Sequence, residues 1–259
     1  MFKKKELRLI KEFAISDFKL KYKRSVLGYF WSLIKPLLML ATLYIVFSVF
    51  INLEIQNYPI FLLLGIILWN FFAEATSSSM SSVLAKANLI KKVSFSKSTV
   101  ILASCLSAFL TLLINIAVFI LFMVIFKISF SWTALLFPFY LIEFIIFIVG
   151  ISFALSALHI KYRDIAHIWE ILLQIGFWIT PIIYPLTKVS FVYRKWYLLN
   201  PLARIIDDSR NALIYGIAPN LADFSAVKHI FITIIICILI FIFGWRIFKK
   251  MSHRFSEYL

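Results

Sequence analysis

The sequence predicts an all-α membrane protein with six transmembrane helices, and three observations support this fold class. Hydrophobic residues make up 63% of the 259 residues, and only 15% of the residues are charged. The mean hydropathy is +0.95. Six strongly apolar stretches are separated by loops of very unequal Lys and Arg content. Because a soluble domain is only about 45–50% apolar, lipid must cover much of this chain.

Each predicted span has the roughly 20 apolar residues that a transmembrane helix needs. The first is uncharged from Pro36 onward, the second is interrupted only by Glu74, and the third has no charge. The fourth holds Glu143 near its middle, and the fifth contains Glu170 near its start and ends in a Pro-containing segment. The six predicted spans are residues 31–53, 58–85, 98–126, 132–160, 165–184 and 229–245.

The basic residues indicate how these spans are oriented. With the N-terminus in the cytoplasm, 20 of the 27 Lys and Arg residues fall on the cytoplasmic side. Short loops rich in Lys and Arg remain on that side when a membrane protein inserts. We therefore expect both termini in the cytoplasm, as an even number of spans requires.

Residues 1–29 predict an amphipathic helix in the cytoplasmic interface, ahead of a transmembrane domain at residues 30–259. Apolar and polar residues each cover about half of a helical wheel in this segment. A soluble basic tail is the alternative, but it does not explain the apolar face. That face consists of Leu7, Leu9, Ile10, Phe13, Ala14 and Phe18.

The segment at residues 186–227 is too polar to span a membrane and too apolar to be a plain linker. Asn200 is a good helix N-cap, Pro201 suits the first turn, and Gly216 suits the position after the last turn. We expect short re-entrant or gate helices here. Such helices enter the membrane from outside or pack on the outer mouth of the bundle.

Several chemistries are not indicated. The sequence contains no GxxxxGK[ST], no Gly-rich dinucleotide fingerprint, no HExxH and no CxxC. Cys105 and Cys237 lie in apolar stretches without paired spacing, so we predict neither a disulfide nor a metal site. The net charge of +15 lies in the loops and marks orientation, so we expect no nucleic-acid partner. His159 and His167 flank a short basic turn, where interfacial polar residues are common, and we predict no catalytic residue.

Six short stretches, in order along the chain, carry a resemblance to a known family. Each is weak alone, but the ordered set covers essentially the whole chain. They resemble the permease subunits of type-2 ABC exporters for bacterial polysaccharides, the group that exports O-antigen, capsule and teichoic-acid chains, and the O-antigen branch is closest. The stretches are Lys19–Leu37 with Leu27-Gly28, Trp31 and Pro36, Asn88–Val93, Tyr162–Ile165, Thr180–Pro185, Asn200-Pro201 and Arg210–Leu213.

The resemblance implies a homodimer of this chain with two copies of a separate ATPase subunit, which binds ATP and Mg²⁺. The cargo would be lipid-linked polysaccharide, such as a glycan on undecaprenyl pyrophosphate, exported across the bacterial cytoplasmic (inner) membrane. One alternative is export of a drug or small lipid. Another is a proton-coupled secondary transporter that uses Glu74, Glu143 and Glu170, and a third is a membrane enzyme built on His159 and His167.

By resemblance, the loop at residues 86–97 contains the coupling helix that docks into the ATPase. The loop is basic and also carries a small apolar face. An ordinary positive-inside loop explains the charge but not that face. The predicted coupling residues are Lys86, Asn88, Leu89, Ile90, Lys91, Lys92 and Phe95.

Clustered cations just before the first span lie where a lipid headgroup would approach. They would attract the dense negative charge of a pyrophosphate, although general attraction to anionic lipids explains them nearly as well. The residues concerned are Lys19, Lys21, Lys23 and Arg24.

A conduit for a sugar polymer should offer aromatic faces and few charges. Aromatic residues make up 18% of this chain, although belts of Trp and Tyr at membrane interfaces are their usual explanation. We expect the three membrane glutamates to make structural contacts between helices rather than a proton relay. The residues predicted to line the translocation path are Trp69, Phe72, Trp178, Tyr184, Tyr193 and Trp196.

Overall fold

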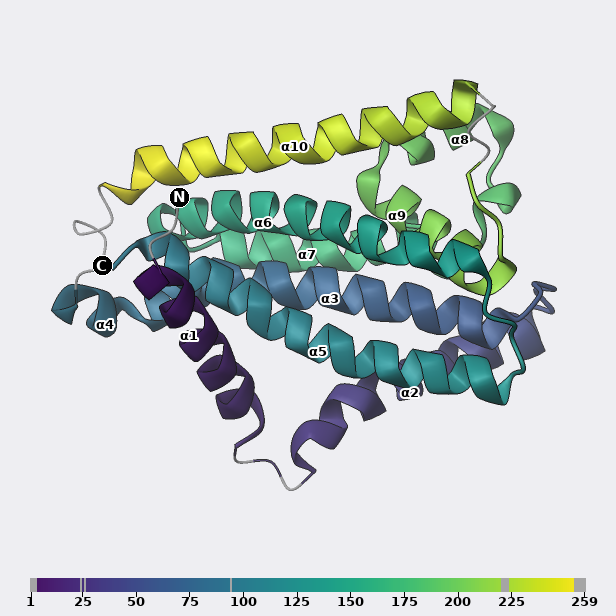
Figure 1. The fold of residues 1–259 in the computed structure, drawn as a ribbon, viewed down its shortest axis with the longest axis horizontal. Helices are drawn as coiled ribbons and strands as arrows, with labels where there is room; N and C mark the ends of the chain where they lie inside the picture. Colours follow the sequence, from purple (N-terminus) through teal and green to yellow (C-terminus); the bar gives the residue numbers. More distant parts are fainter. Residues whose placement is uncertain (1–3, 24, 26, 94, 220–223, 254–259) are drawn as a thin grey trace.

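The long apolar stretches of the sequence form long helices that run side by side (Figure 1). Within the described residues every regular element is helical, as the sequence predicts. Among the described residues, five segments are long and apolar enough to cross a membrane. The structure is a computed structural model that describes residues 4–23, 25, 27–93, 95–219 and 224–253.

These five segments overlap five of the six predicted spans. The first combines η1 (Gly28–Phe30) and α2 (Trp31–Tyr44) with a terminal π-helical turn, η2 (Ile45–Phe50). In the fourth, a 3-10 helix, η3 (Trp132–Leu136), leads directly into the α-helix. The other long helices are α3 (Tyr58–Ala85), α5 (Lys97–Ile125), α6 (Phe137–Lys161) and α10 (Phe224–Ser252).

The remaining predicted span, residues 165–184, corresponds to a shorter helix. α7 (Ile165–Ile179) has 15 residues and ends before Thr180, whose backbone is extended (φ −69°, ψ 139°). Pro181 explains this end, because a proline disfavours the helical conformation of the residue before it and lacks an N–H group. The structure thus contains five long apolar helices and one short apolar helix where the sequence predicts six full spans.

The shorter elements gather at the two ends of the bundle. Figure 1 shows α4 at the same end as the first turn of α1 and the C-terminal end of α10, while α8 and α9 lie at the opposite end. These elements are α1 (Lys4–Tyr22), α4 (Ala87–Lys92), η4 (Leu186–Lys188), α8 (Phe191–Leu199), α9 (Pro201–Arg210) and η5 (Asn211–Tyr215).

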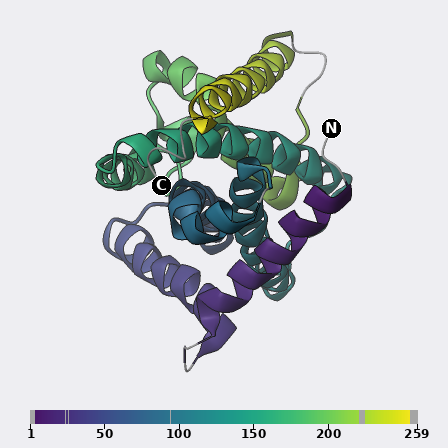
Figure 2. The same cartoon turned by 90° about the vertical axis from the view of Figure 1, so that its left-hand side faces the viewer.

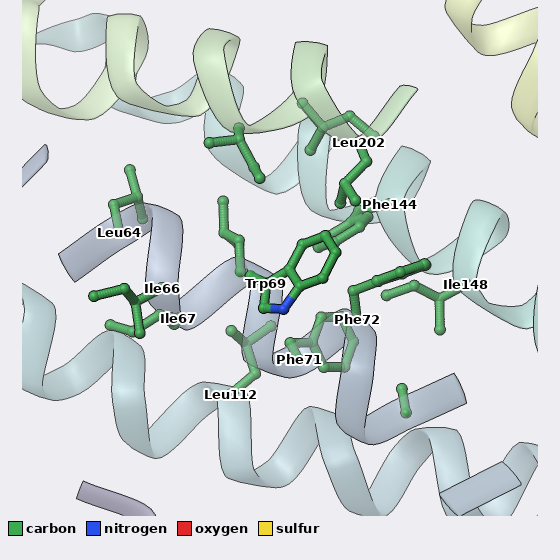
Figure 3. Packing of buried hydrophobic residues seen from close by; sticks show 14 of the residues in the cluster. Leu64, Ile66, Ile67, Trp69, Phe71, Phe72, Leu112, Phe144, Ile148 and Leu202 are labelled. Atoms are coloured by element: carbon green, nitrogen blue, oxygen red, sulfur yellow. The ribbon is translucent and has the colours of Figure 1, made fainter. Parts of the chain in front are cut away.

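α3 lies at the centre of the bundle and packs against α2, α5 and α6. In the end view of Figure 2, α10 and α2 lie on opposite sides with α3 between them. Figure 3 shows the aromatic side chains that fill this core. The Phe72 ring stacks on Phe144 and Phe147, with centroid distances of 6.4 and 5.8 Å, and Phe71 meets Phe144 edge-on at 5.7 Å.

α6 and α10 approach each other closely at two glycines. A Cβ added at Gly150 would lie 2.6 Å from the Cα atom of Phe241, and a Cβ at Gly244 would collide with the Gly150 carbonyl. Small residues allow this kind of close backbone contact between membrane helices. The two helices are therefore packed backbone to backbone at this point.

The helix predicted within residues 186–227 is confirmed at both ends. The Asn200 side chain accepts a hydrogen bond from the Leu202 N–H (3.1 Å), and Pro201 occupies the first turn of α9. The helical path continues through η5 to Gly216, whose φ of +66° is left-handed. Leu202 and Ile206 are buried, so α9 packs into the bundle.

Candidate functional site

A groove with a volume of about 840 Å³ opens on the side of the bundle. We call it the lateral groove. α2 and η2 form one wall, α3 forms the floor, and α7 forms the other wall. The α2–η2 wall is apolar apart from Thr42, whereas the floor and the α7 wall combine polar and aromatic side chains.

The polar side chains of the lateral groove come from three helices. Asn70 lies on α3, while Glu170 and Gln174 lie one turn apart on α7 and are exposed. Thr42 on α2 donates a hydrogen bond to the Leu38 carbonyl (2.9 Å). Polar groups at membrane depth are costly unless they face water or protein. The lateral groove is therefore a surface for water, a polar ligand or another subunit rather than for lipid.

Aromatic rings lie beside these polar groups. The Trp69 ring meets Phe177 edge-on, with the centroids 5.8 Å apart. Gly176 makes room for the indole, because a Cβ there would lie 2.9 Å from Trp69. Trp178 is 59% exposed at the groove. Exposed rings can stack on sugar faces, and the amide and carboxylate groups can bond sugar hydroxyls.

The six side chains predicted to line a path are not brought together. Trp69 and Trp178 line the lateral groove. Phe72 is only 5% exposed and belongs to the core. Tyr193 and Trp196 are exposed on α8, within residues 186–227. Charge and aromatic content guided the sequence prediction, so the uncharged Thr42, Asn70 and Gln174 of the groove were missed.

Tyr184 caps the end of α7 instead of facing the lateral groove. Its hydroxyl group lies 2.7 Å from the Ile179 carbonyl oxygen and 3.2 Å from that of Trp178. It also lies 3.3 Å from the hydroxyl of Tyr197 on α8. Carbonyls at a helix end lack intrahelical partners, so this contact stabilises the early end of α7.

Arg210 joins α9 to α3 and to the turn after α7. Its Nε donates to the Phe61 carbonyl (3.1 Å), and its two terminal nitrogens donate to the carbonyls of Pro181 and Ile182 (both 2.6 Å). The guanidinium lies 3.5 Å from the centroid of the Phe61 ring. Burial lowers the pKa of Arg210 to about 9, against the opposing effect of Asp207, so it stays charged at neutral pH.

The cations predicted to meet a lipid headgroup have different surroundings. Lys19 and Lys23 are exposed and line a groove of about 560 Å³ on α1 together with Ser16 and Tyr29. Lys21 instead forms an ion pair with Glu74 on α3 (2.7 Å). Arg24 lies outside the described residues.

Two of the three membrane glutamates contact other helices, as expected for a structural role. Glu74 also accepts a hydrogen bond from Thr111 of α5 (3.2 Å), so it connects α1, α3 and α5. Glu143 of α6 accepts from the Cys237 thiol of α10 (3.8 Å). Glu170, in contrast, lies in the lateral groove.

The predicted coupling loop contains a short helix, α4, at one end of the bundle (Figure 1). Asn88, Lys91 and Lys92 are exposed, and Leu89 is 37% exposed. Ile90 packs against the core. The two ends of the loop contact α1. Lys86 forms an ion pair with Asp17, and the ring of Phe95 meets that of Phe13 edge-on at 5.6 Å.

The family is decided by a match over most of the chain. The model of the ABC-2 type transporter family matches residues 8–214. The chain belongs to this family. The matched residues include α2, α3, α7 and the rest of the lateral groove, as well as α4 and α9.

Curated members with similar sequences have names that mention polysaccharides. An O-antigen export system permease protein RfbA of Klebsiella pneumoniae is 32% identical over 94% of this chain and 92% of its own length. One of the same name from Myxococcus xanthus is 24% identical over 83% of this chain and 76% of its own length. The polysialic acid transport protein KpsM of Escherichia coli is 26% identical over 78% of this chain and 80% of its own length.

Proposed function

We propose that this ABC-2 type protein is the membrane permease subunit of an ATP-driven exporter that moves lipid-linked polysaccharide out of the cytoplasm. The lateral groove carries the proposal, because it combines the exposed ring of Trp178 with the polar groups of Asn70, Glu170 and Gln174 inside otherwise apolar helices. That chemistry suits a sugar polymer better than it suits lipid. The names of the Klebsiella and Escherichia relatives point to the same class of cargo.

In this proposal the chain crosses the bacterial cytoplasmic membrane six times. Five crossings use the long helices, and the sixth uses α7 with the turn that follows it. α1 lies in the cytoplasmic interface, and both termini are cytoplasmic. The common location of α1, α4 and the end of α10 at one end of the bundle supports this orientation (Figure 1).

Two copies form a homodimer in which the lateral grooves face each other. The exposed surface of α7 supports this arrangement, because it mixes Ile171 and Trp178, which are 55% and 59% exposed, with the polar Glu170 and Gln174. Lipid suits the apolar residues but not the polar ones. Two facing grooves would enclose a hydrated path between the copies.

ATP hydrolysis is assigned to a separate subunit that binds α4. α4 lies at the proposed cytoplasmic end and exposes both an apolar side chain, Leu89, and the cations Lys91 and Lys92. No phosphate-binding loop motif occurs in this sequence. ATP and Mg²⁺ would therefore be bound by the partner, and closure of the ATPase would move α4.

The cargo's lipid anchor would approach along α1. Lys19 and Lys23 line the exposed α1 groove with Ser16, and the two cations outnumber the one carboxylate there, that of Glu12. Ammonium and hydroxyl groups are suitable donors for a diphosphate, such as that of an undecaprenyl pyrophosphate-linked glycan. Because Lys21 is paired with Glu74, we assign the binding of the diphosphate to Lys19 and Lys23.

The decisive experiment purifies the chain with its ATPase in lipid nanodiscs. ATP hydrolysis should rise several-fold when lipid-linked glycan is added, and no such rise should follow addition of the anchor lipid without sugar. If a drug or a short lipid stimulates ATP hydrolysis several-fold and the glycan does not, the proposed cargo is wrong.

Trp178→Ala should reduce glycan export at least fivefold without unfolding the protein. Trp178 is 59% exposed, so its removal costs little packing but removes a ring from the groove. Surface glycan, measured with a lectin, reports export, and thermal unfolding reports stability. Trp132→Ala is the matched control, because Trp132 is 88% exposed and does not line the groove. Equal glycan export by the two variants would show that the lateral groove is not part of the translocation path.

Glu74→Gln tests whether the Glu74 carboxylate has a structural role or takes part in a proton relay. The Lys21–Glu74 pair is partly exposed, with side-chain exposures of 38% and 28%. We expect its loss to cost only about 0.5–1 kcal/mol of stability. Export should stay within about twofold of wild type, with an unchanged pH profile, because ATP-driven export needs no proton transfer. A tenfold export defect in a stably folded variant would favour the relay.

A further inference from the structure

A second groove opens between α1, α3, α5 and α6, and we call it the α1–α5 groove. Its volume is about 360 Å³. Apart from the Cys105 thiol, every described side chain that lines it is a hydrocarbon. Leu7 and Ile10 come from α1, Leu106 and Phe109 from α5, and Ile145 from α6. The groove thus has no group that would hold water or a sugar.

The two grooves lie on opposite sides of α3. Trp69 and Asn70 line the lateral groove, whereas Phe71 lines the α1–α5 groove. At 3.6 residues per turn, Phe71 points about 150° away from the midpoint of the other two. Figure 3 shows the Trp69 and Phe71 side chains leaving α3 in different directions. A second copy that covers the lateral groove therefore leaves the α1–α5 groove facing lipid.

The depth of the α1–α5 groove matches one leaflet. On α5, its lining residues run from Leu102 to Phe109, which lie about 8 to 18 Å along the helix from Lys97 at a rise of 1.5 Å per residue. Half of the hydrocarbon core of a bilayer is about 15 Å thick. A groove that begins beside the interfacial helix α1 thus reaches the middle of the membrane.

Three cations lie near Leu7 on α1, on the side away from Ile10. Lys4, Arg8 and Lys11 are exposed and lie at positions −3, +1 and +4 from Leu7, so Lys4 and Lys11 share its face of α1 and Arg8 lies about 100° around the helix. In the part of the chain that the structure describes, none of them forms an ion pair. Cations at the cytoplasmic interface attract anionic headgroups.

A second copy of the chain does not suit this surface. A two-fold interface brings the same patch of both subunits together. Here it would place the cations of one α1 against those of the other, and like charges repel. A lipid, by contrast, matches both features, because its acyl chain is apolar and its phosphate is negative.

We propose that the α1–α5 groove binds one acyl chain of an anionic phospholipid of the cytoplasmic leaflet, with its phosphate held by Lys4, Arg8 and Lys11. The bound lipid fills the space between α1 and the α5–α6 pair and so holds α1 against the bundle. The site rests on the proposed membrane orientation but not on the identity of the cargo.

The acyl-chain part of the proposal is tested by filling the groove. The full-length protein in detergent is mixed with equal amounts of phosphatidylglycerol and phosphatidylethanolamine, washed, and analysed by native mass spectrometry. Wild type should retain at least fivefold more phosphatidylglycerol, and Leu106→Trp should retain at least fivefold less of it than wild type. Leu113→Trp, on the same helix at a 46% exposed position outside the groove, should behave as wild type.

The headgroup part is tested by removing charge. The triple variant Lys4→Gln, Arg8→Gln, Lys11→Gln should retain the two phospholipids equally. Its control removes three exposed cations from the end of α10 and should keep the wild-type preference. The control substitutions are Arg246→Gln, Lys249→Gln and Lys250→Gln.

Three results would overturn the lipid site. They are equal retention of both phospholipids by wild type, unchanged retention by Leu106→Trp, and displacement of phosphatidylglycerol by an equal amount of a polyprenyl phosphate. If Leu106→Trp does not fold, Ile145→Trp fills the same groove from α6. Selective lipid retention by a chain that exports no glycan would contradict the proposed function and leave this site standing.

Discussion

Arg210→Met is expected to lower the free energy of unfolding by about 3–5 kcal/mol, the largest stability effect we predict for a single side chain. The guanidinium is 1% exposed and donates to three carbonyls from two separate segments. Each buried acceptor that loses its donor costs roughly 1–3 kcal/mol. Two of these carbonyls, those of Pro181 and Ile182, follow the end of α7 and lack a helical partner.

Arg210→Lys should be nearly as damaging. An ammonium group is a compact point charge, whereas the flat fork of Arg is matched to several carbonyls at once. Gly65→Ala tests the same contact without a change of charge, because a Cβ at Gly65 would press on the Arg210 guanidinium and lie 3.2 Å from Ile182. We expect it to destabilise the protein by a smaller amount.

Thermal unfolding in detergent or nanodiscs measures these effects, with yield of monodisperse protein as a second readout. Arg194→Met is the control, because Arg194 is only half-buried and its guanidinium donates to one carbonyl, that of Thr187 (3.0 Å). Its stability should remain within about 0.5 kcal/mol of wild type. An unfolding temperature for Arg210→Met equal to that of the control would show that the hydrogen bonds of Arg210 contribute nothing to stability.

Leu89→Asp is expected to reduce ATP-coupled export at least tenfold while the chain still inserts and folds. Leu89 is 37% exposed on α4, so its replacement removes little packing within this subunit. In an interface with the ATPase, a carboxylate at this position would lose its water without gaining a partner. Burying an unpaired polar group costs about 1–3 kcal/mol, and 1.4 kcal/mol is a tenfold change in binding.

The neighbouring side chains are less suitable for this test. Ile90 packs against the core, so Ile90→Asp would disturb folding as well as docking. Phe95 contacts Phe13 of α1, and Lys86 pairs with Asp17, so these residues hold the loop in place rather than offering a free surface. Leu89 is therefore the side chain that reports docking alone.

Stimulated ATP hydrolysis and copurification with the ATPase measure the effect of Leu89→Asp. Leu89→Met keeps an apolar side chain and should retain coupling. His253→Asp places the same carboxylate at an exposed residue near the end of α10 and should also retain it. Normal coupling by Leu89→Asp in a folded complex would mean that α4 does not dock through this side chain.

Features set by local sequence were predictable. The length of the apolar stretches predicts the long helices. The Asn200-Pro201 pair and Gly216 predict the two ends of the helix formed by α9 and η5. The end of α7 was missed, although Pro181 is visible in the sequence, because the apolar run continues to Tyr184. The groups that satisfy this end, Arg210 and the Tyr184 hydroxyl, become evident only once the chain is folded.

The lateral groove could be predicted only in part. Trp69 and Trp178 were found through their aromatic rings, but Phe72 has the same chemistry and lies in the core. Whether a ring faces the core or a groove depends on which helix packs on it, and composition does not carry that information. Asn70 and Gln174 carry no charge and did not stand out among the apolar residues around them.

The early end of α7 has a consequence for the bilayer next to it. A helix of 15 residues is about 22 Å long, some 8 Å shorter than the hydrocarbon layer. Non-helical backbone is tolerated at that depth only where protein encloses it or water reaches it. In the proposed orientation, the outer quarter of this crossing is thus a turn that the protein encloses, because Arg210 binds the carbonyls of Pro181 and Ile182 and Ile182 is buried, so lipid does not have to solvate this backbone.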